Sequence, residues 1–174
     1  MPAVSLLLVA CQVLIGAVFA VSAFTKLRGR AAMRSFASSL TMLPARLRLA
    51  VAGVVAAGEA AAAALMVVPR AGLPLAGVLL CGFCAVIVIT MRQGLRVPCR
   101  CFGSSGSHLG PVHLVRNGLL LTVVALGWTA LAVSGAPPTV AQLAIAVPAG
   151  LAGAILMIAW DDIADLFKET SGSV

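Results

Sequence analysis

Charged residues are scarce in this chain of 174 residues. Asp, Glu, Lys and Arg make up 10% of it, whereas the apolar residues A, V, I, L, M, F, W, Y and C make up 61%. Soluble domains average about 45–50% apolar residues even with Gly included, and a small domain leaves much of its surface in water. The composition therefore excludes a water-soluble fold and indicates that lipid surrounds the protein.

Aromatic and acidic residues are also few. The sequence has no Tyr, two Trp and six Phe, and its five acidic residues against twelve Lys and Arg give a net charge of +7. Surfaces that bind single-stranded nucleic acid combine basic grooves with aromatic side chains that stack on bases. Here the basic residues lie between apolar runs, so we interpret them as membrane-orienting charges that also favour anionic lipid headgroups. We expect no nucleic-acid partner.

Long apolar runs occupy most of the chain. A run of about 20 residues crosses the hydrocarbon core of a bilayer, and it must be helical because lipid offers no hydrogen bonds to the backbone. The sequence predicts five such helices, at 4–25, 49–68, 73–91, 112–133 and 139–160. With no repeat and no second domain visible, we expect an all-α, polytopic membrane helix bundle in which residues 1–174 form a single integral-membrane domain.

The segment 30–43 has a different pattern. Apolar residues recur in it at helical spacing, opposite Arg30 and Arg34. This pattern is typical of an amphipathic helix that lies in the membrane interface.

The basic residues are distributed unevenly between the two sides of the predicted bundle. Six lie between the first and second helices, three more lie between the third and fourth, and Lys168 is in the tail, whereas the opposite side has only Arg70. Because positively charged loops remain in the cytoplasm, we expect a bacterial inner-membrane protein with its N-terminus outside and its C-terminus in the cytoplasm.

Glu59 lies near the middle of the second apolar run. A carboxylate at that depth is costly, so it indicates a function or a buried partner. Arg116 and Asn117, near the start of the fourth run, are candidate partners that would complete an intramembrane polar cluster. The cluster could be a structural clamp, a site of proton or redox chemistry, or the surroundings of an inert protonated Glu.

Three of the five cysteines lie within apolar runs. Cys81 and Cys84 have the Cys-x-x-Cys spacing of redox pairs, and Cys11 is at a depth similar to that of Cys81. On a continuous helix, however, buried cysteines are also common small apolar side chains. These three cysteines are either a redox relay or small apolar side chains that only fill space between the helices.

Cys99 and Cys101 form a more specific motif, which follows Pro98 and precedes Phe102 and a Gly-Ser-rich stretch. Neighbouring Arg96 and Arg100 favour the thiolate. A disulfide across one intervening residue is strained, and strained disulfides exchange readily. The motif therefore favours a redox pair, although a structural role or a zinc site completed by His108 and His113 stays open. We expect no resident metal or cofactor, and no residue pattern indicates a quinone.

The run Cys99–Gly103, followed by Arg116-Asn117 at the start of the next helix, resembles the MauE family of methylamine utilisation proteins. Lys26 and Glu59 also fit the pattern of that family. The resemblance covers about residues 5–133 and departs at Arg100, where the family often has Gly. It implies a DoxX-like four-helix core, to which the run 139–160 adds a fifth helix.

The resemblance also implies a function in the maturation of exported redox proteins. Methylamine dehydrogenase, whose small subunit is rich in disulfides, is the namesake client, and a thioredoxin-like protein is a further expected partner. If the chain is an enzyme, it is a thiol-disulfide oxidoreductase. The alternatives are a non-catalytic scaffold or transport subunit that docks a thioredoxin-like partner, and a small transporter that depends on Glu59.

Overall fold

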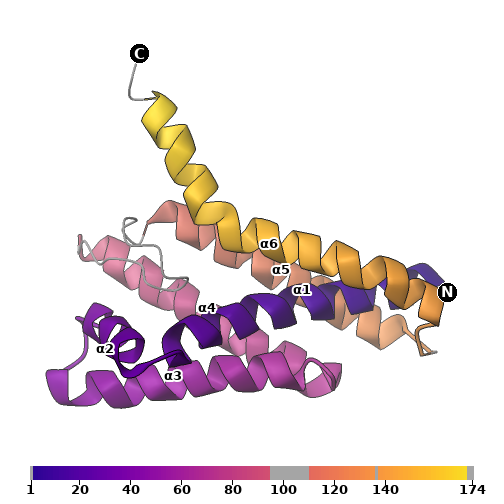
Figure 1. Cartoon of the computed structure of the whole chain (residues 1–174), viewed down its shortest axis with the longest axis horizontal. Helices are drawn as coiled ribbons and strands as arrows, with labels where there is room; N and C mark the ends of the chain where they lie inside the picture. Colours follow the sequence, from indigo (N-terminus) through magenta and orange to yellow (C-terminus); the bar gives the residue numbers. More distant parts are fainter. Residues whose placement is uncertain (1, 95–109, 136, 172–174) are drawn as a thin grey trace.

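The computed structural model describes residues 2–94, 110–135 and 137–171 (Figure 1). The chain forms six helices within these ranges: α1 (Pro2–Leu27), α2 (Arg30–Ser39), α3 (Ala45–Leu65), α4 (Pro69–Arg92), α5 (Pro111–Val133) and α6 (Val140–Ser171). Five of them contain a stretch long and apolar enough to cross a membrane, and in α6 that stretch is Val140–Trp160. The expected all-α, polytopic bundle is confirmed.

Prolines move the ends of two helices from the expected positions. The sequence predicted helices at 49–68 and 73–91, but α3 ends at Leu65 and α4 already begins at Pro69. Val68, at φ −120° and ψ 83°, is not helical. The ring of Pro69 fixes φ at a helical value, and its missing N–H is not needed in a first helical turn. Arg70 therefore belongs to α4 and not to a loop.

Helix α2 is also shorter than predicted. We expected helix over 30–43, but the last helical residue is Ser39, and Leu40 leaves the helix at ψ 53°. Pro44 then begins the approach to α3, and the residue before a proline is sterically disfavoured from helical geometry. The hydroxyl of Ser39 donates to the Phe36 carbonyl in the last turn of α2.

Helix α1 lies at the centre of the packing. It contacts α3, α5 and α6, while α4 packs against α3 and α5, and α2 packs against α3 and the end of α1 (Figure 1). Figure 1 also shows the yellow, C-terminal part of α6 turning away from the bundle. The main apolar core comes from several of these helices and includes Ile15, Phe19, Leu73, Leu80 and Leu120.

The α1–α6 contact is unusually close. A Cβ built on Gly150 would lie 2.7 Å from the backbone oxygen of Ala10 and 2.8 Å from the Cβ of Val13. A Cβ on Gly153 would lie 2.7 Å from Leu14 Cδ1. Small residues allow helices to approach this closely in lipid, where dispersion contacts replace the hydrophobic effect as a driving force for association.

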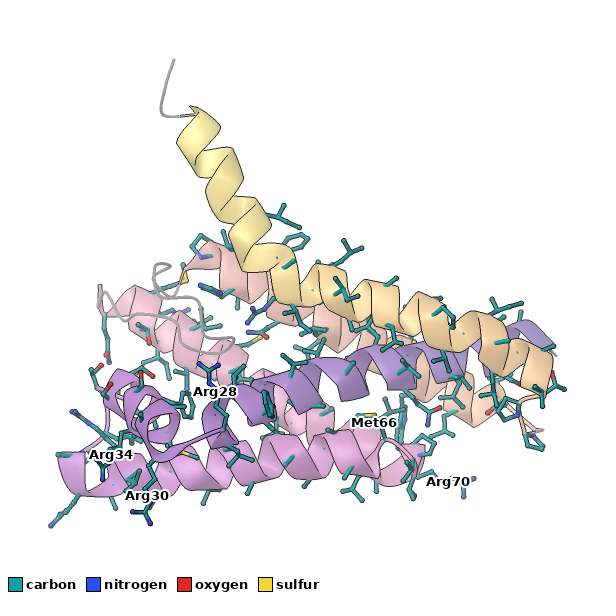
Figure 2. The ribbon with its side chains drawn as sticks, viewed as in Figure 1. Arg28, Arg30, Arg34, Met66 and Arg70 are labelled. Atoms are coloured by element: carbon teal, nitrogen blue, oxygen red, sulfur yellow. The ribbon has the colours of Figure 1, made fainter. Side chains whose placement is uncertain are left out.

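The two ends of the bundle differ in charge. Figure 2 shows Arg28, Arg30 and Arg34 gathered at one end and Arg70 at the opposite end. The difference follows from the chain's path. Helix α1 ends and α3 begins at the end with Arg28, Arg30 and Arg34, whereas α3 connects to α4 at the end with Arg70. The asymmetry matches the pattern from which the orientation in the membrane was predicted.

Candidate functional site

A buried ion pair joins α1 to α3. The ammonium Nζ of Lys26 lies 2.6 Å from Glu59 Oε1 and 2.7 Å from Glu59 Oε2. Both side chains are 1% exposed. Lys26 also donates to the hydroxyl of Ser22 at 2.7 Å, and that hydroxyl donates to Glu59 Oε1 at 3.0 Å. The three side chains form a closed network, which offsets the cost of removing both charges from water.

The path of the chain explains why these residues meet. Lys26 and Ser22 are four residues apart on α1, so they share one face of its last turns. Beyond Leu27 the chain folds back as α2, which packs beside the first half of α3 through Phe36, Ala37 and Ala52. Glu59 is therefore level with the end of α1, although it lies well inside α3. The ring centroid of Phe36 lies 4.8 Å from Lys26 Nζ, a cation–π distance.

A cavity of about 520 Å³ adjoins the ion pair. Side chains from α1, α2, α3, α4 and α5 and from the segment between α2 and α3 line it, and most of them are apolar. Glu59 and Ser22 form part of the polar wall. The volume is within the range of about 300–1,000 Å³ that small-molecule sites have.

A polar face of α5 lines the same cavity. His113, Arg116 and Asn117 are spaced at i, i+3 and i+4, so they stand on one face of the helix. Each is buried, with exposed fractions of 2%, 3% and 5%. Imidazole, guanidinium and amide groups can all donate hydrogen bonds. The wall can therefore hold an oxygen-bearing group within an otherwise apolar space.

The predicted polar cluster is thus only part of what the structure brings together. Glu59, Arg116 and Asn117 all line one cavity. Arg116 was one candidate partner of Glu59, and the structure adds Lys26, which donates to both carboxylate oxygens. Sequence reasoning treated Lys26 as a loop charge, and its place in the family pattern beside Glu59 was the signal that could have identified the pair.

The cysteines are distributed over different surroundings. Cys11 is buried, Cys81 is exposed and Cys84 is half-buried, and all three are free thiols. A Cβ on Gly127 of α5 would lie 3.3 Å from the Cβ of Cys11, so that cysteine packs in the α1–α5 interface. Cys99 and Cys101 lie outside the described residues.

The segment that carries Cys99 and Cys101 joins two helices of the cavity. It follows Gly94, just after α4, and precedes Gly110, just before α5. Thr90 and His113, near these two helix ends, both line the cavity. Within the described part of the chain, no three His, Cys, Asp or Glu side chains gather as a metal site would require. The alternative zinc site includes His108 and both motif cysteines, all outside that part.

The family model described as "Methylamine utilisation protein MauE" matches residues 4–132, which include α1 to α5 almost completely. No curated protein and no solved structure matches the chain.

Proposed function

Because this chain belongs to the MauE family, we propose that it is a membrane accessory protein that helps exported redox proteins to mature by thiol-disulfide exchange at Cys99 and Cys101. One observation carries the proposal: the family match, residues 4–132, spans both the Cys-Arg-Cys-Phe-Gly motif and the helices that form the polar cavity. The part of the chain that the family shares thus contains both the Cys-x-Cys motif and the residues that line a cavity of ligand size.

The chemistry of the proposed step is a disulfide transfer. A thiolate of the client attacks the Cys99–Cys101 disulfide, giving a mixed disulfide, and a second client thiolate resolves it. The client then holds a disulfide, and Cys99 and Cys101 are left as two thiols. The cationic side chains of Arg96 and Arg100 favour the thiolate leaving group, and strain in a two-cysteine ring with one intervening residue favours the transfer.

The ion pair has a supporting function in this proposal. Both oxygens of Glu59 accept from Lys26, and Ser22 completes the network. Such an arrangement favours the clamp interpretation over a transport site, because a proton or cation would have to displace a buried ammonium. The clamp fixes α1 against α3, and both helices line the cavity.

Maturation of a disulfide-rich client tests the proposal. The client is the small subunit of methylamine dehydrogenase, produced with the wild type or with Cys99→Ser or Cys101→Ser. We expect each cysteine variant to lower disulfide-complete client to the level of cells that lack the protein, with membrane abundance of the variant unchanged. Ser105→Ala, in the same segment, is the matched control and should mature the client as the wild type does. Normal maturation in both cysteine variants would reject thiol exchange and leave a scaffold.

The side of the membrane on which the motif lies is a separate part of the proposal. The charge pattern puts Cys99 and Cys101 in the cytoplasm, where thiols are kept reduced, whereas the client matures outside. Either reducing equivalents pass across the bilayer, with Cys81, Cys84 and Cys11 as the outer partners that receive them from the client, or the orientation is the opposite one.

A membrane-impermeant maleimide applied to intact spheroplasts separates these cases. The spheroplasts are first treated with a membrane-impermeant reductant, which is then removed, so that a Cys99–Cys101 disulfide does not block labelling. Labelling of a variant whose only cysteines are Cys99 and Cys101 then reports an outer motif, whereas labelling only after lysis and reduction reports a cytoplasmic one. In the second case Cys81→Ser should also stop client maturation. Normal maturation in Cys81→Ser would contradict the relay.

A further inference from the structure

The cavity has a lining suited to one chemical class of ligand. Three of the six Phe in the sequence, Phe19, Phe36 and Phe83, line it, although they come from three different helices. Aromatic side chains offer flat faces against which a planar ring can stack or pack edge-on. Half of the chain's Phe thus line one space, and their faces suit a planar group.

Hydrogen-bond donors lie on one wall of the same space. His113, Arg116 and Asn117 on α5 carry N–H groups, and their side chains are buried within the bundle. A ligand with acceptor oxygens at its ring can accept hydrogen bonds from groups of this kind, whereas an acyl chain offers no acceptor.

The cavity reaches the lipid-facing surface of α4. Val78 and Val86, which line it, are 70% and 44% exposed. Val51 and Val55, one turn apart on α3, line it as well, and Figure 1 shows α3 and α4 diverging from their short connection. A ligand dissolved in the membrane can therefore enter sideways from the hydrocarbon, and an apolar tail can remain there.

A planar ring, acceptor oxygens and an apolar tail are together the chemistry of an isoprenoid quinone. We infer that the cavity is a quinone-binding site, with the ring between the phenylalanines and a carbonyl oxygen toward His113, Arg116 and Asn117. The inference rests on the proposed function in one respect, because thiol oxidation requires an electron acceptor. Two thiols that form a disulfide release two electrons and two protons, and a quinone that takes up both becomes the quinol.

Photolabelling of the purified full-length chain in phospholipid nanodiscs tests the site. The probe is a benzoquinone that carries one azido group and a short isoprenoid tail, and labelled peptides are mapped by mass spectrometry. We expect the label on α4 and α5, and we expect Val55→Phe, which fills part of the cavity, to weaken labelling about tenfold. Val54→Phe is the matched control, because Val54 immediately precedes Val55 on α3 but is 72% exposed and does not line the cavity. Its labelling should equal that of the wild type.

A variant that lacks one hydrogen-bond donor tests how the quinone ring is oriented in the cavity, with little change in the cavity volume. Asn117→Leu should weaken labelling by about tenfold, the loss expected when one good hydrogen bond to a buried ligand is removed. Thr122→Val, an exposed position on the same helix, should have no effect. Two results would overturn the inference. One is equal labelling of Val55→Phe and Val54→Phe. The other is that phosphatidylglycerol displaces the probe at the same concentration as unlabelled quinone does.

The binding test does not depend on the thiols. Labelling is also measured in the double variant Cys99→Ser/Cys101→Ser, where we expect wild-type binding. Binding there together with normal client maturation would reject the proposed function and keep the quinone site. Loss of maturation in the cysteine variants without any cavity labelling would reject the quinone site and keep thiol exchange.

Discussion

The α1–α3 and α1–α6 interfaces share one helix but are built from opposite kinds of contact. Toward α3, α1 presents Lys26 and Ser22, which bond to Glu59 with both charges buried. Toward α6 it presents apolar side chains that meet glycines, and Gly150 approaches the α1 backbone. The ionic contact fixes one relative position of two helices, since its partners are costly to separate, whereas the small-residue contact depends on shape alone.

Removing one partner of the ion pair should have the largest effect. Glu59→Leu leaves the Lys26 ammonium buried without its carboxylate, and we expect it to lower the free energy of unfolding by about 3–5 kcal/mol. Reversible unfolding in mixed micelles, followed by circular dichroism, measures the loss.

The double variant Lys26→Met/Glu59→Leu separates charge from shape. Since both charges are then absent, we expect it to be more stable than either single variant, which is a strong coupling in a double-mutant cycle. Additive losses would mean that the two residues stabilise the bundle independently. The ion pair would then not be what fixes α1 against α3.

The glycine contact should respond to added volume. Gly150→Ala places a methyl group where the nearest α1 backbone oxygen is 2.7 Å away, so α1 and α6 must move apart. We expect a loss of about 1–3 kcal/mol in the same unfolding measurement. Gly118→Ala on α5 is the control, because a Cβ there meets nothing within 4 Å, and alanine should be neutral or slightly stabilising. A loss of equal size at both positions would mean that replacing any helical glycine lowers stability, and that the close α1–α6 contact is not the cause.

The helical architecture was predictable because lipid permits few alternatives. Apolar runs of membrane-spanning length and the absence of water as a bonding partner gave the helices and the five candidate spans. Their ends were less predictable where Pro69 and Pro44 decide them, because a hydropathy pattern does not distinguish an apolar helix residue from an apolar turn such as Met66–Val68.

Which residues meet was harder to predict than which residues are helical. Glu59 was identified as unusual from its apolar surroundings, and Arg116 and Asn117 were its candidate partners; all three line the cavity. Its ionic partner was not anticipated, because hydropathy places Lys26 at the end of a helix and Glu59 in the middle of another. The backward fold of α2 beside α3 makes those depths equal, and that is a tertiary feature. The cavity is likewise a tertiary feature, because residues from five helices line it.

The smallest expected effect separates the hydrogen-bonded part of the ion-pair network from its charges. Ser22→Ala removes the hydroxyl that accepts from Lys26 and donates to Glu59 while leaving the ion pair in place. We expect a loss of about 0.5–1.5 kcal/mol, the net contribution of a typical hydrogen bond, because Lys26 and Glu59 still satisfy each other in the ion pair. Thr129→Ala, whose hydroxyl only bonds to the Leu126 carbonyl of its own helix, should change stability by less than about 0.5 kcal/mol. If Ser22→Ala were as harmless as that control, the two charges alone would hold α1 against α3, and Ser22 would be only a small residue that lets them approach.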